Sequence, residues 1–392
     1  MIILKKQTKS LCHLCFKEIP AKIIQENNQV YMIRNCPVHG EFKKLIEKDA
    51  TIYKELMNRE YLPKEISPEH LMFTATYRCS ENCPICYLPE RKNEPLSLDT
   101  IKKAIIATKA KRIRISGGEP TERDDVMEII SFIHKQNKIG YLITNGLRLI
   151  DRSYVKRLKK SGIGYVILAF NGFDDNTYIK INGRKLLDIK LKALKNLIKE
   201  KINISLSVML VRNLNEKELR KIIRFCFLNC SLIHNLRIRN TSTVGRHLDD
   251  EPLFLSEIIS MIEDEFGLER YELIKKRHRY PIHSVCWMDF SFMSLFIQNR
   301  YKHIKNPYIK RFFYLKIFMQ KMGILATLLL ILRKLFGKPF DFKITVRCRP
   351  DINTVDLMEI QAGCPSRYLL RDGKTEFPYC LALILNDHNF IL

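Results

Sequence analysis

Three cysteines that lie close together in the sequence could hold an iron–sulfur cluster. They are Cys79, Cys83 and Cys86, at spacings of four and three residues. A 4Fe-4S cluster that only transfers electrons takes four cysteines, so three thiolates leave one iron without a protein ligand. We interpret this loop as catalytic, because an open iron can bind a substrate or a cofactor. The alternative is a zinc site whose fourth ligand comes from a distant part of the chain.

Two predicted strands flank the cysteine loop. The apolar run 71–76 predicts a strand that ends at the cysteines, and the alternating segment 112–115 predicts a second strand. The second strand runs into the segment 117–120, which reads Gly-Gly-Glu-Pro. The two glycines would let a ligand lie against the backbone, and the proline would end the strand pairing.

The cysteine loop, followed about thirty residues later by Gly-Gly-Glu-Pro, resembles the radical S-adenosylmethionine (SAM) superfamily. The resemblance implies that SAM chelates the open iron and that Gly117, Gly118, Glu119 and Pro120 form the segment that contacts its methionine amino group. It implies that one electron from the cluster splits a carbon–sulfur bond of SAM, releasing a 5′-deoxyadenosyl radical that abstracts hydrogen from an unactivated C–H bond. It also implies a low-potential electron donor of the ferredoxin or flavodoxin type.

Composition describes a globular chain with a strong positive charge. The 392 residues are 46% hydrophobic, and the formal net charge is +25. Such a charge would attract nucleic acid, anionic lipid headgroups or acidic substrates, although lysine-rich usage can also follow from genome composition. The first residues contain no apolar run long enough for a signal peptide, so we interpret the twelve cysteines as thiolate ligands in a reducing cytoplasm. The expected location is cytoplasmic, with a peripheral position at the membrane face as an option.

Residues 1–62 form a predicted metal-binding module. Cys12 and Cys15 form one Cys-x-x-Cys turn, and Cys36 and His39 form a second turn with the same spacing. Three thiolates and one imidazole on paired turns are typical of a tetrahedral zinc site, and iron can occupy the same geometry. His13, inside the first turn, is an alternative ligand, but the spacing favours His39. The sequence does not distinguish zinc from iron.

Residues 68–247 alternate strand-like and helix-like segments in six units. This alternation predicts an α/β fold, a partial (β/α)6 TIM-like barrel, because a closed eight-stranded barrel needs about 250 residues. An open barrel of this kind is also the fold that the resemblance implies. In such barrels the chemistry lies at the C-terminal ends of the strands.

Four polar residues after predicted strands are candidate SAM contacts. Thr144, Asn145 and Asn171 match positions that contact the ribose or the sulfonium side of SAM in the superfamily, although the same residues also form ordinary turns. Arg246, after the sixth strand, could pair with the SAM carboxylate or a substrate anion, or lie on the surface.

Residues 248–392 are predicted to form a C-terminal region with its own cluster. Between Lys310 and Lys338 the sequence predicts an apolar helix with a narrow lysine-bearing polar face, too short to span a bilayer. This helix could lie buried across the barrel mouth or act as an interfacial anchor on an anionic membrane. Four cysteines in this region are predicted to hold one auxiliary 4Fe-4S cluster, since four is the number that closes a cluster: Cys286, Cys348, Cys364 and Cys380. A predicted hairpin turn at 371–374 would place the last two on adjacent strands.

The three regions together resemble a narrower group, which includes the archaeal tetraether lipid synthase and pterin-methylating radical SAM proteins. Those relatives carry two auxiliary clusters, whereas the cysteines here suffice for one, because Cys226 and Cys230 are expected to pack in a helix core. The expected function is radical SAM chemistry on a lipid-like substrate, forming or alkylating C–C bonds. The alternatives are a methyltransferase of a small heterocycle and a peptide-modifying maturase. A non-catalytic protein that binds nucleic acid through its charge is a further alternative, which the intact motifs disfavour.

Overall fold

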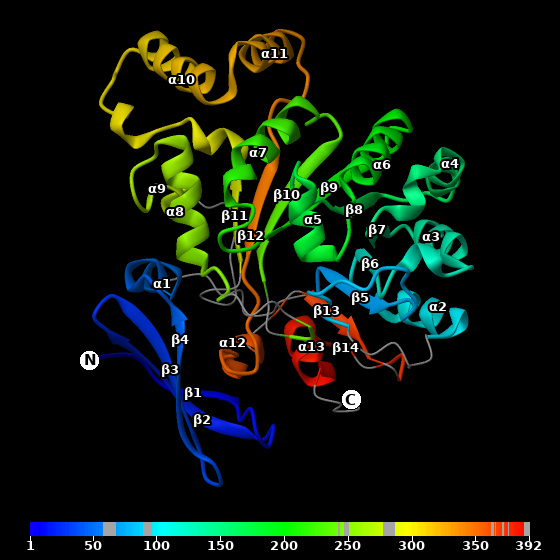
Figure 1. The fold of residues 1–392 in the computed structure, drawn as a ribbon, viewed down its shortest axis with the longest axis vertical. Helices are drawn as coiled ribbons and strands as arrows, with labels where there is room; N and C mark the ends of the chain where they lie inside the picture. Colours follow the sequence, from blue (N-terminus) through cyan, green and yellow to red (C-terminus); the bar gives the residue numbers. More distant parts are fainter. Residues whose placement is uncertain are drawn as a thin grey trace.

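The strands of the protein form two sheets, which are seen together in Figure 1. The computed structural model describes residues 1–57, 68–88, 96–241, 244–246, 251–276, 287–361, 364, 366–370, 372–374 and 376–387. Within these ranges one sheet has four strands and the other has ten. The small sheet belongs to the predicted N-terminal module, and the predicted barrel forms the middle of the large sheet.

The small sheet is antiparallel, with its strands in chain order. It consists of β1 (Ile2–Leu11), β2 (Glu18–Glu26), β3 (Gln29–Cys36) and β4 (Gly40–Glu47), and helix α1 (Ala50–Met57) follows it. Two residues join β2 to β3, and Asn27 has the left-handed backbone (φ +53°) that tight hairpin turns require. Ile23 and Met32 pack with Tyr53 of α1 in a small core of their own.

Six parallel strands form the middle of the large sheet and pair in chain order. They are β5 (His70–Thr74), β6 (Arg112–Ser116), β7 (Ile139–Thr144), β8 (Tyr165–Ala169), β9 (Asn203–Leu210) and β10 (Ile233–Asn240). The helices between them are α2 (Leu98–Ala107), α3 (Val126–Lys135), α4 (Arg152–Lys160), α5 (Asp175–Asn182), α6 (Leu187–Lys199) and α7 (Leu219–Leu228). This arrangement confirms the predicted α/β class with six βα units after an N-terminal module.

Side-chain periodicity explains why these segments pack as they do. In β6, Ile113 and Ile115 are fully buried in the core between the sheet and its helices, and the alternate residue Arg114 lines a cavity on the other face. In α3 the buried residues recur at helical spacing: Val126, Ile129, Ile130 and Ile133. The core therefore lies on the helix side of the sheet and leaves the inner side for a functional site.

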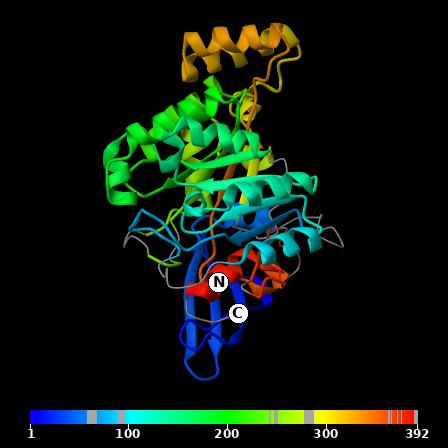
Figure 2. The same cartoon turned by 90° about the vertical axis from the view of Figure 1, so that its right-hand side faces the viewer.

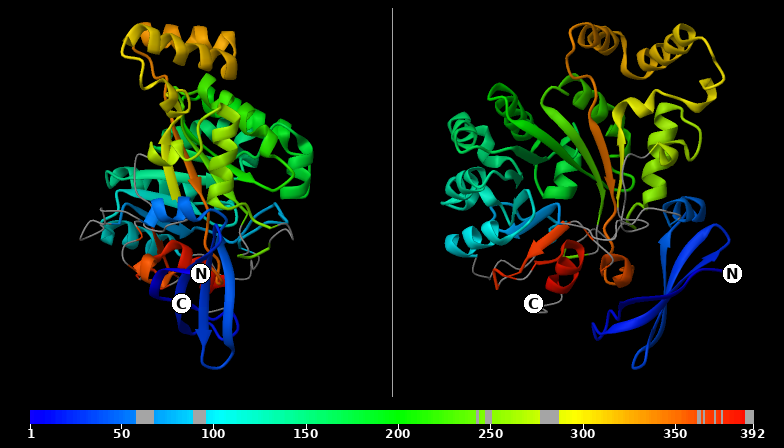
Figure 3. Two further views of the ribbon diagram at one scale, coloured as in Figure 1. Left: turned by 90° about the vertical axis from the view of Figure 1, so that its left-hand side faces the viewer. Right: turned by 180° about the vertical axis from the view of Figure 1, so that it is seen from behind.

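The region after residue 250 extends the large sheet at both edges. β12 (Lys343–Arg347) pairs in parallel with β10, and β11 (Trp287–Ser291) pairs with β12 in antiparallel fashion, as Figure 3 shows from behind. At the other edge β13 (Ser366–Leu369) pairs in parallel with β5, and β14 (Glu376–Pro378) completes a hairpin with β13. The predicted C-terminal region therefore supplies outer strands of the barrel itself, a pairing between distant segments that the sequence did not predict.

The apolar segment between Lys310 and Lys338 is not one helix, as predicted, but two. Gly323 (φ +87°) interrupts the segment between α10 (Pro307–Met322) and α11 (Ile324–Leu335). A residue with this backbone leaves the right-handed helix, and glycine adopts it without a steric penalty. The shared polar face predicted for one continuous helix is therefore lost.

α10 and α11 lie at one end of the molecule, and the small sheet lies at the opposite end (Figure 2). The Arg333 guanidinium of α11 donates hydrogen bonds to the carbonyl oxygens of Phe227 (2.7 Å) and Leu228 (3.0 Å), near the end of α7. That end of α7 leads into the N-terminal end of β10, so the predicted position across the barrel mouth is wrong. No helix among the described residues is long and apolar enough to cross a membrane.

The remaining helices connect the two sheets. They are α8 (Leu255–Phe266), α9 (Glu272–Lys275), α12 (Leu357–Gln361) and α13 (Tyr379–Asp387). The Glu47 carboxyl at the end of β4 accepts hydrogen bonds from the backbone N–H (3.3 Å) and the hydroxyl of Ser256 in α8, and burial raises the pKa of Glu47 to about 7. Arg34 of β3 donates to the carbonyl oxygen of Ile352 (3.3 Å) and to the Asn353 side chain (2.9 Å). The small sheet is thus held against the C-terminal region.

Candidate functional site

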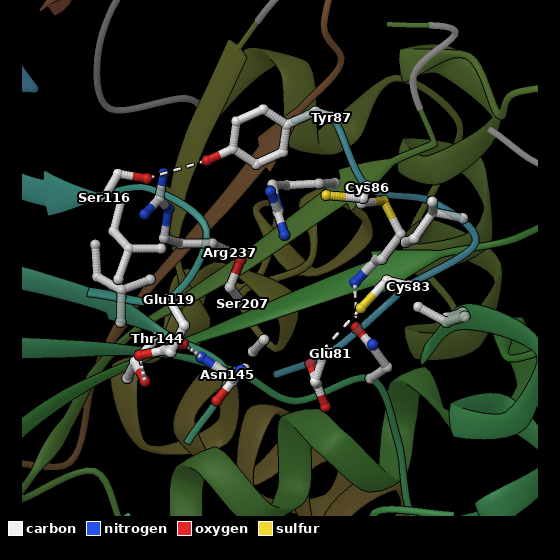
Figure 4. Close-up of a pocket in the computed structure, with 18 of the residues that line it drawn as sticks. Glu81, Cys83, Cys86, Tyr87, Ser116, Glu119, Thr144, Asn145, Ser207 and Arg237 are labelled. Carbon is white, nitrogen blue, oxygen red and sulfur yellow. Dashed lines mark hydrogen bonds between the residues drawn. The ribbon is translucent and has the colours of Figure 1, made fainter. Parts of the chain in front are cut away.

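A cavity lies inside the large sheet, where the ends of its parallel strands meet the cysteine loop (Figure 4). The predicted residues that line it are Cys79, Cys83, Cys86, Gly117, Gly118, Glu119, Thr144, Asn145 and Asn171. Five arginines also line it, namely Arg114, Arg237, Arg239, Arg347 and Arg349. The structure therefore gathers most of the predicted site residues around one space, together with a group of cations that the sequence analysis missed.

All three loop cysteines border the cavity, and polar groups surround them. The Asn182 side-chain amide donates to Cys83 Sγ (3.4 Å), and the Glu81 carboxylate lies 3.6 Å from the same sulfur. Burial, and then the charge of Glu81, raise the pKa of Cys83 to about 12. The thiol therefore keeps its proton until a metal ion displaces it.

The two glycines after β6 are required by the backbone of the cysteine loop. A Cβ on Gly118 would lie 2.7 Å from the carbonyl oxygen of Tyr77 and closer still to that of Arg78. The Gly118 N–H donates to the Thr76 carbonyl oxygen (2.8 Å), and the Glu119 N–H donates to that of Arg78 (2.8 Å). The close approach is thus between two chain segments, whereas the sequence analysis expected a ligand to need this space.

Glu119 is a buried residue that connects the ends of β6 and β7. Its carboxylate accepts hydrogen bonds from the Thr121 N–H (3.1 Å) and hydroxyl (2.6 Å), the Thr144 hydroxyl (2.7 Å) and the Asn145 N–H (2.7 Å). Burial raises the pKa of Glu119, and these donors oppose that effect. Pro120 begins the short helix η1 (Pro120–Glu122) that presents Thr121. Glu119 and Thr144 therefore position each other, and their predicted contacts with SAM stay a prediction.

Asn145 and Asn171 lie next to the cysteines in different ways. The Asn145 amide lies 4.0 Å from Cys79 Sγ. The Asn171 amide donates to Asn182 (3.4 Å), which in turn donates to Cys83, and the Asn171 side-chain oxygen accepts from the Met209 N–H (3.0 Å). Asn171 thus connects the end of β8 to β9 and, through one residue, to the loop.

Arg246 supports the cysteine loop and does not line the cavity. Its N–H donates to the Cys86 carbonyl oxygen (2.8 Å), and its guanidinium bonds to the Asn82 side chain. The neighbouring Gly245 (φ +76°) lies so close to the loop that a Cβ there would be 2.6 Å from the Cα of Tyr87. The structure therefore favours a positioning role for Arg246 over the predicted contact with the SAM carboxylate.

Lys190 of α6 is a buried cation beside the cluster loop that the sequence analysis missed. Its side chain is fully buried, and its ammonium donates to the Asn145 carbonyl oxygen. Burial lowers the pKa of Lys190, and the charges of Glu81, Glu119 and Cys83 oppose that effect. In the sequence Lys190 belongs to a lysine-rich amphipathic helix, so nothing distinguishes it from its exposed neighbours.

The four ligands predicted for the N-terminal site lie together. The donor atoms of Cys12, Cys15, Cys36 and His39 are all within 4.8 Å of one another. His39 Nδ1 lies 3.5 Å from both Cys12 Sγ and Cys36 Sγ, and Cys15 Sγ lies 3.9 Å from Cys36 Sγ. The alternative ligand His13 instead packs its ring against Phe42, with 4.5 Å between the centroids.

The four cysteines predicted for an auxiliary cluster are distributed differently. Cys286 lies outside the described residues. Cys348 follows β12 and is buried with its sulfur 4.0 Å from the Leu253 carbonyl oxygen, and burial raises its pKa well above the usual range. Cys364 and Cys380 flank the β13–β14 hairpin, close enough for the charge of Cys380 to raise the pKa of Cys364 after burial does so. The hairpin was predicted correctly, but the two cysteines do not lie on its strands, because Cys364 precedes β13 and Cys380 lies in α13. The auxiliary cluster stays a prediction. Cys226 and Cys230 lie in the main core, as predicted.

Sequence comparisons identify two regions of the chain. The profile of the radical SAM superfamily matches residues 73–226, and the profile described as the HMPTM N-terminal zinc ribbon domain matches residues 4–48. A crystal structure of Streptococcus suis SuiB bound to S-adenosylmethionine is 15% identical with a TM-score of 0.45, covering 67% of this chain and 69% of that chain.

Two curated relatives are similar over longer stretches. A 7,8-dihydro-6-hydroxymethylpterin dimethyltransferase from Methanocaldococcus jannaschii is 31% identical over 327 residues, which cover 72% of this chain and 62% of that protein. A probable GTP 3′,8-cyclase from Pyrococcus abyssi is 26% identical over 218 residues, which cover 54% of this chain and 69% of that protein. The chain thus spans less than two thirds of the length of the dimethyltransferase. The cysteine loop and the Gly-Gly-Glu-Pro segment both fall within residues 73–226, and this region of the chain is a radical SAM domain.

Proposed function

We propose that this protein is a radical SAM enzyme that acts at a C–H bond of a substrate held in the cavity of the large sheet. The observation that carries the proposal is that Cys79, Cys83 and Cys86 border the same cavity as the Gly-Gly-Glu segment. Three thiolates at one side of a cavity suit a 4Fe-4S cluster whose fourth iron faces a ligand.

The residues around the loop fit such a cluster. Cys79, Cys83 and Cys86 would hold three irons, Asn182 donates to one of the sulfurs, and Lys190 places a positive charge near the thiolates. When bound, the cluster supplies the electron that splits a carbon–sulfur bond of SAM. The chain holds the loop in place through Gly118 and Arg246 and keeps the Glu119 carboxylate at the cavity wall. The electron would come from a low-potential donor of the ferredoxin or flavodoxin type.

Methyl or alkyl transfer to a small heterocycle is the reaction we favour. The relative with the highest identity reported above is named as a methyltransferase of a hydroxymethylpterin, and the match includes most of this chain. The lipid-like substrate expected from the sequence has less support, because no residue of α10 or α11 lines the cavity.

An anaerobic assay tests this proposal. Protein reconstituted with iron and sulfide, reduced with dithionite and given SAM is expected to form 5′-deoxyadenosine. Addition of 7,8-dihydro-6-hydroxymethylpterin is expected to increase the yield and to give a product heavier by one or more methyl groups, measured by mass spectrometry. Extracted membrane lipids serve as the comparison substrate.

The outcomes test the proposed substrate and the proposed enzyme activity independently. Stimulation by lipid alone would overturn the heterocycle and restore the lipid-like substrate. Absence of 5′-deoxyadenosine from protein that holds a complete cluster, established by iron count and absorption spectrum, would overturn the enzyme itself.

The exposed face of α10 and α11 supports a second function, which is contact with an anionic membrane. Large apolar side chains on these helices face solvent, among them Phe312 (62% exposed), Leu325 (67%), Leu332 (50%) and Leu335 (74%). Several large apolar side chains exposed on two neighbouring helices are typical of an interaction site. The helices are held to α7 by Arg333, so the apolar face belongs to a fixed part of the fold.

The charge of this segment points to lipid headgroups as the partner. Residues 301–340 contain nine lysines and arginines and no aspartate or glutamate. Lys316 and Lys334 are exposed on the same two helices. Apolar side chains with lysines beside them suit a helix pair that lies in the headgroup region of an anionic bilayer.

Vesicle flotation tests the membrane contact. The protein is expected to bind vesicles that contain anionic lipid more strongly than neutral vesicles. Leu325→Glu or Leu332→Glu should each weaken that binding about tenfold, since each removes one exposed leucine that would be buried in the bilayer. Ile106→Glu is the matched control, because Ile106 of α2 is equally apolar and 62% exposed but lies elsewhere. Equal losses for all three variants would mean that net charge alone causes binding, and the helix pair would then have no specific role.

We also propose zinc for the N-terminal site. In a tetrahedral zinc site, sulfur–sulfur distances are about 3.8 Å and sulfur–nitrogen distances about 3.6 Å, which follow from the usual bond lengths. The observed separations of 3.9 Å between Cys15 and Cys36 and 3.5 Å from His39 to Cys12 and Cys36 support this geometry. Iron has similar geometry, so the metal itself is to be measured.

A further inference from the structure

Five arginines converge on the cavity from strands at opposite sides of the barrel. Arg237 and Arg239 belong to β10, and Arg347 and Arg349 to the end of β12 and the residues after it, while Arg114 belongs to β6. Arg239 lies directly opposite Arg347 in the parallel pairing of β10 and β12. Like charges at directly opposite positions destabilise a sheet, so this placement needs a functional reason.

Strand alternation directs these side chains to the inner face. In β10, Leu236 and Ile238 are fully buried in the core under the helices, and Arg237 and Arg239 take the alternate positions. In β6, Arg114 lies two residues before Ser116, the last residue of the strand. It therefore projects one inward position deeper than Ser116.

The arginines are close enough to repel one another across the barrel. β7, β8 and β9 separate β6 from β10 in the sheet, yet burial and then the charge of Arg347 lower the pKa of Arg114 to about 9. Burial, followed by the charge of Arg114, lowers the pKa of Arg237 well below its usual value. The curvature of the sheet thus brings the cations of β6, β10 and β12 together.

No carboxylate of the described residues forms an ion pair with Arg114, Arg237 or Arg239. The Nε atoms of Arg114 and Arg239 are buried and have no hydrogen-bond partner among the described residues. The acidic residues that line the cavity are Glu81 and Glu119, which face Cys83 and the ends of β6 and β7 respectively. Buried cations without counter-ions are costly, so a ligand must be expected to supply the negative charge.

Arg349 is held in a fixed orientation at the edge of this group. Its guanidinium lies over the rings of Tyr87 (5.3 Å) and Tyr379 (5.2 Å). Tyr87 belongs to the cysteine loop, and its hydroxyl shares a hydrogen bond with the Ser116 hydroxyl (3.0 Å). Tyr379 is the first residue of α13. The arginine group is therefore connected to the loop that carries the cysteines, and a ligand held by it would lie in the same cavity.

We propose that the arginines bind a phosphate-bearing part of the substrate, most simply a diphosphate group, and thereby place the rest of the substrate toward the cysteines. The planar guanidinium matches the oxygens of phosphate through paired hydrogen bonds, which is why arginine is used where phosphate is recognised. The single carboxylate of SAM would neutralise one of Arg114, Arg237 and Arg239 and leave the other two without a counter-ion among the described residues. This inference rests on the proposed function and refines its substrate class: the heterocycle would carry a phosphate group, and 7,8-dihydro-6-hydroxymethylpterin, which carries none, would act as a weaker substrate.

Calorimetric titration of the reconstituted protein with inorganic pyrophosphate at fixed ionic strength tests the proposal. The wild type is expected to bind, and Arg114→Gln and Arg237→Gln are each expected to weaken binding about 10- to 100-fold, as loss of a hydrogen bond to a charged group does. Arg112→Gln is the matched control, because Arg112 is exposed at the start of the same strand and pairs with Glu69 (3.1 Å). It should leave pyrophosphate binding unchanged.

The melting temperature (Tm), measured with and without pyrophosphate, tests the proposal even if one variant folds poorly. Without pyrophosphate, Arg237→Gln is expected to raise the Tm, because it removes a repelled cation. Pyrophosphate is expected to raise the Tm of the wild type and of Arg112→Gln more than that of Arg237→Gln. A drop in the Tm of both Arg237→Gln and Arg239→Gln without pyrophosphate would indicate that the cations stabilise the protein and would overturn the proposal. So would a wild type that binds pyrophosphate no better than Arg237→Gln does.

Two further measurements distinguish a soluble phosphate-bearing substrate from a lipid headgroup, and the arginine proposal from the proposed enzyme activity. Competition by a nucleoside diphosphate would indicate a soluble substrate, and competition by a short-chain phosphatidic acid would indicate a lipid headgroup. Wild-type protein that forms 5′-deoxyadenosine but binds no pyrophosphate would overturn the arginine proposal and leave the enzyme intact. Pyrophosphate binding without 5′-deoxyadenosine would overturn the enzyme and leave an anion-binding cavity.

Discussion

Gly118→Ala protein is expected to assemble no 4Fe-4S cluster on anaerobic reconstitution and to form at least about 100-fold less 5′-deoxyadenosine than the wild type. A Cβ at this position would lie 2.7 Å from the Tyr77 carbonyl oxygen and closer to that of Arg78. Both oxygens belong to the backbone that leads into Cys79, so the loop must move to make room. The effect is large because one methyl group displaces three cysteines together.

The conflict at Gly118 cannot be relieved by rotating a side chain. The Gly118 and Glu119 N–H groups hydrogen-bond to Thr76 and Arg78, so moving the loop also breaks these two bonds. A shift of about 1 Å in a reacting group is enough to lower a rate about 100-fold. The iron count per chain and the absorption spectrum of the cluster measure the first effect, and the yield of 5′-deoxyadenosine measures the second.

Gly140→Ala is the matched control for this substitution. Gly140 lies in β7, and a Cβ there would meet the side chains of Ile163 (3.6 Å) and Ile133 (3.7 Å) at ordinary contact distance. We expect this variant to keep its cluster and its activity. If Gly118→Ala held a full cluster, the two loop segments would have to be more compliant than their hydrogen bonds imply, and the glycine would then have another role.

The sequence predicted the cysteine loop, the glycine segment and the six parallel strands because each is a local pattern. Alternation over residues 112–115 predicts β6, and a spacing of four and three predicts a three-thiolate site. Pairing between distant segments has no such local signal, so the addition of β12 beside β10 and of β13 beside β5 could not be read from the chain. The break at Gly323 was missed because one glycine in an apolar run is tolerated in many helices.

The arginine group had a sequence signal that went unused. The pattern Arg-x-Arg occurs at 112–114, at 237–239 and at 347–349, in or at the end of a strand, and once more at 277–279, outside the described residues. Alternation places both arginines of a pair on one face, and the parallel strands of a barrel turn that face inward. Three such Arg-x-Arg pairs in one barrel therefore indicate that its interior is positively charged. A single pair, such as the one in the predicted strand 112–115, indicates only that one face of that strand is polar.

The roles of Glu119 and Arg246 depended on contacts that spacing does not determine. Both were predicted to contact SAM. In the structure Glu119 accepts four hydrogen bonds from the protein, and Arg246 bonds to Asn82 and Cys86. These contacts show what holds each side chain in place, and the predicted contacts of both residues with SAM stay predictions.

The N-terminal site allows a second large effect to be predicted with a control of the same residue type. His39→Ala protein is expected to retain no zinc after dialysis, and the wild type is expected to retain about one zinc ion per chain, measured by elemental analysis. His13→Ala should retain zinc like the wild type, because the His13 ring packs on Phe42 and lies outside the ligand group. Loss of zinc in both variants would mean that packing around the turns, and not ligation, controls metal binding.

Loss of this zinc is expected to unfold much of the small sheet, because its core is small and structural zinc supplies about 10 kcal/mol or more of folding free energy in such modules. The described buried cluster at the metal site consists of Cys12, Cys36 and Ile19, and the two cysteines are ligands themselves. Arg34 of this sheet bonds to the segment that leads from β12 to α12, so unfolding should also loosen the C-terminal edge of the barrel. Hydrogen exchange should then increase in β1–β4 and in 351–361 of His39→Ala but not in β7 or β8, whereas exchange confined to residues 12–39 would show that the sheet folds without its metal.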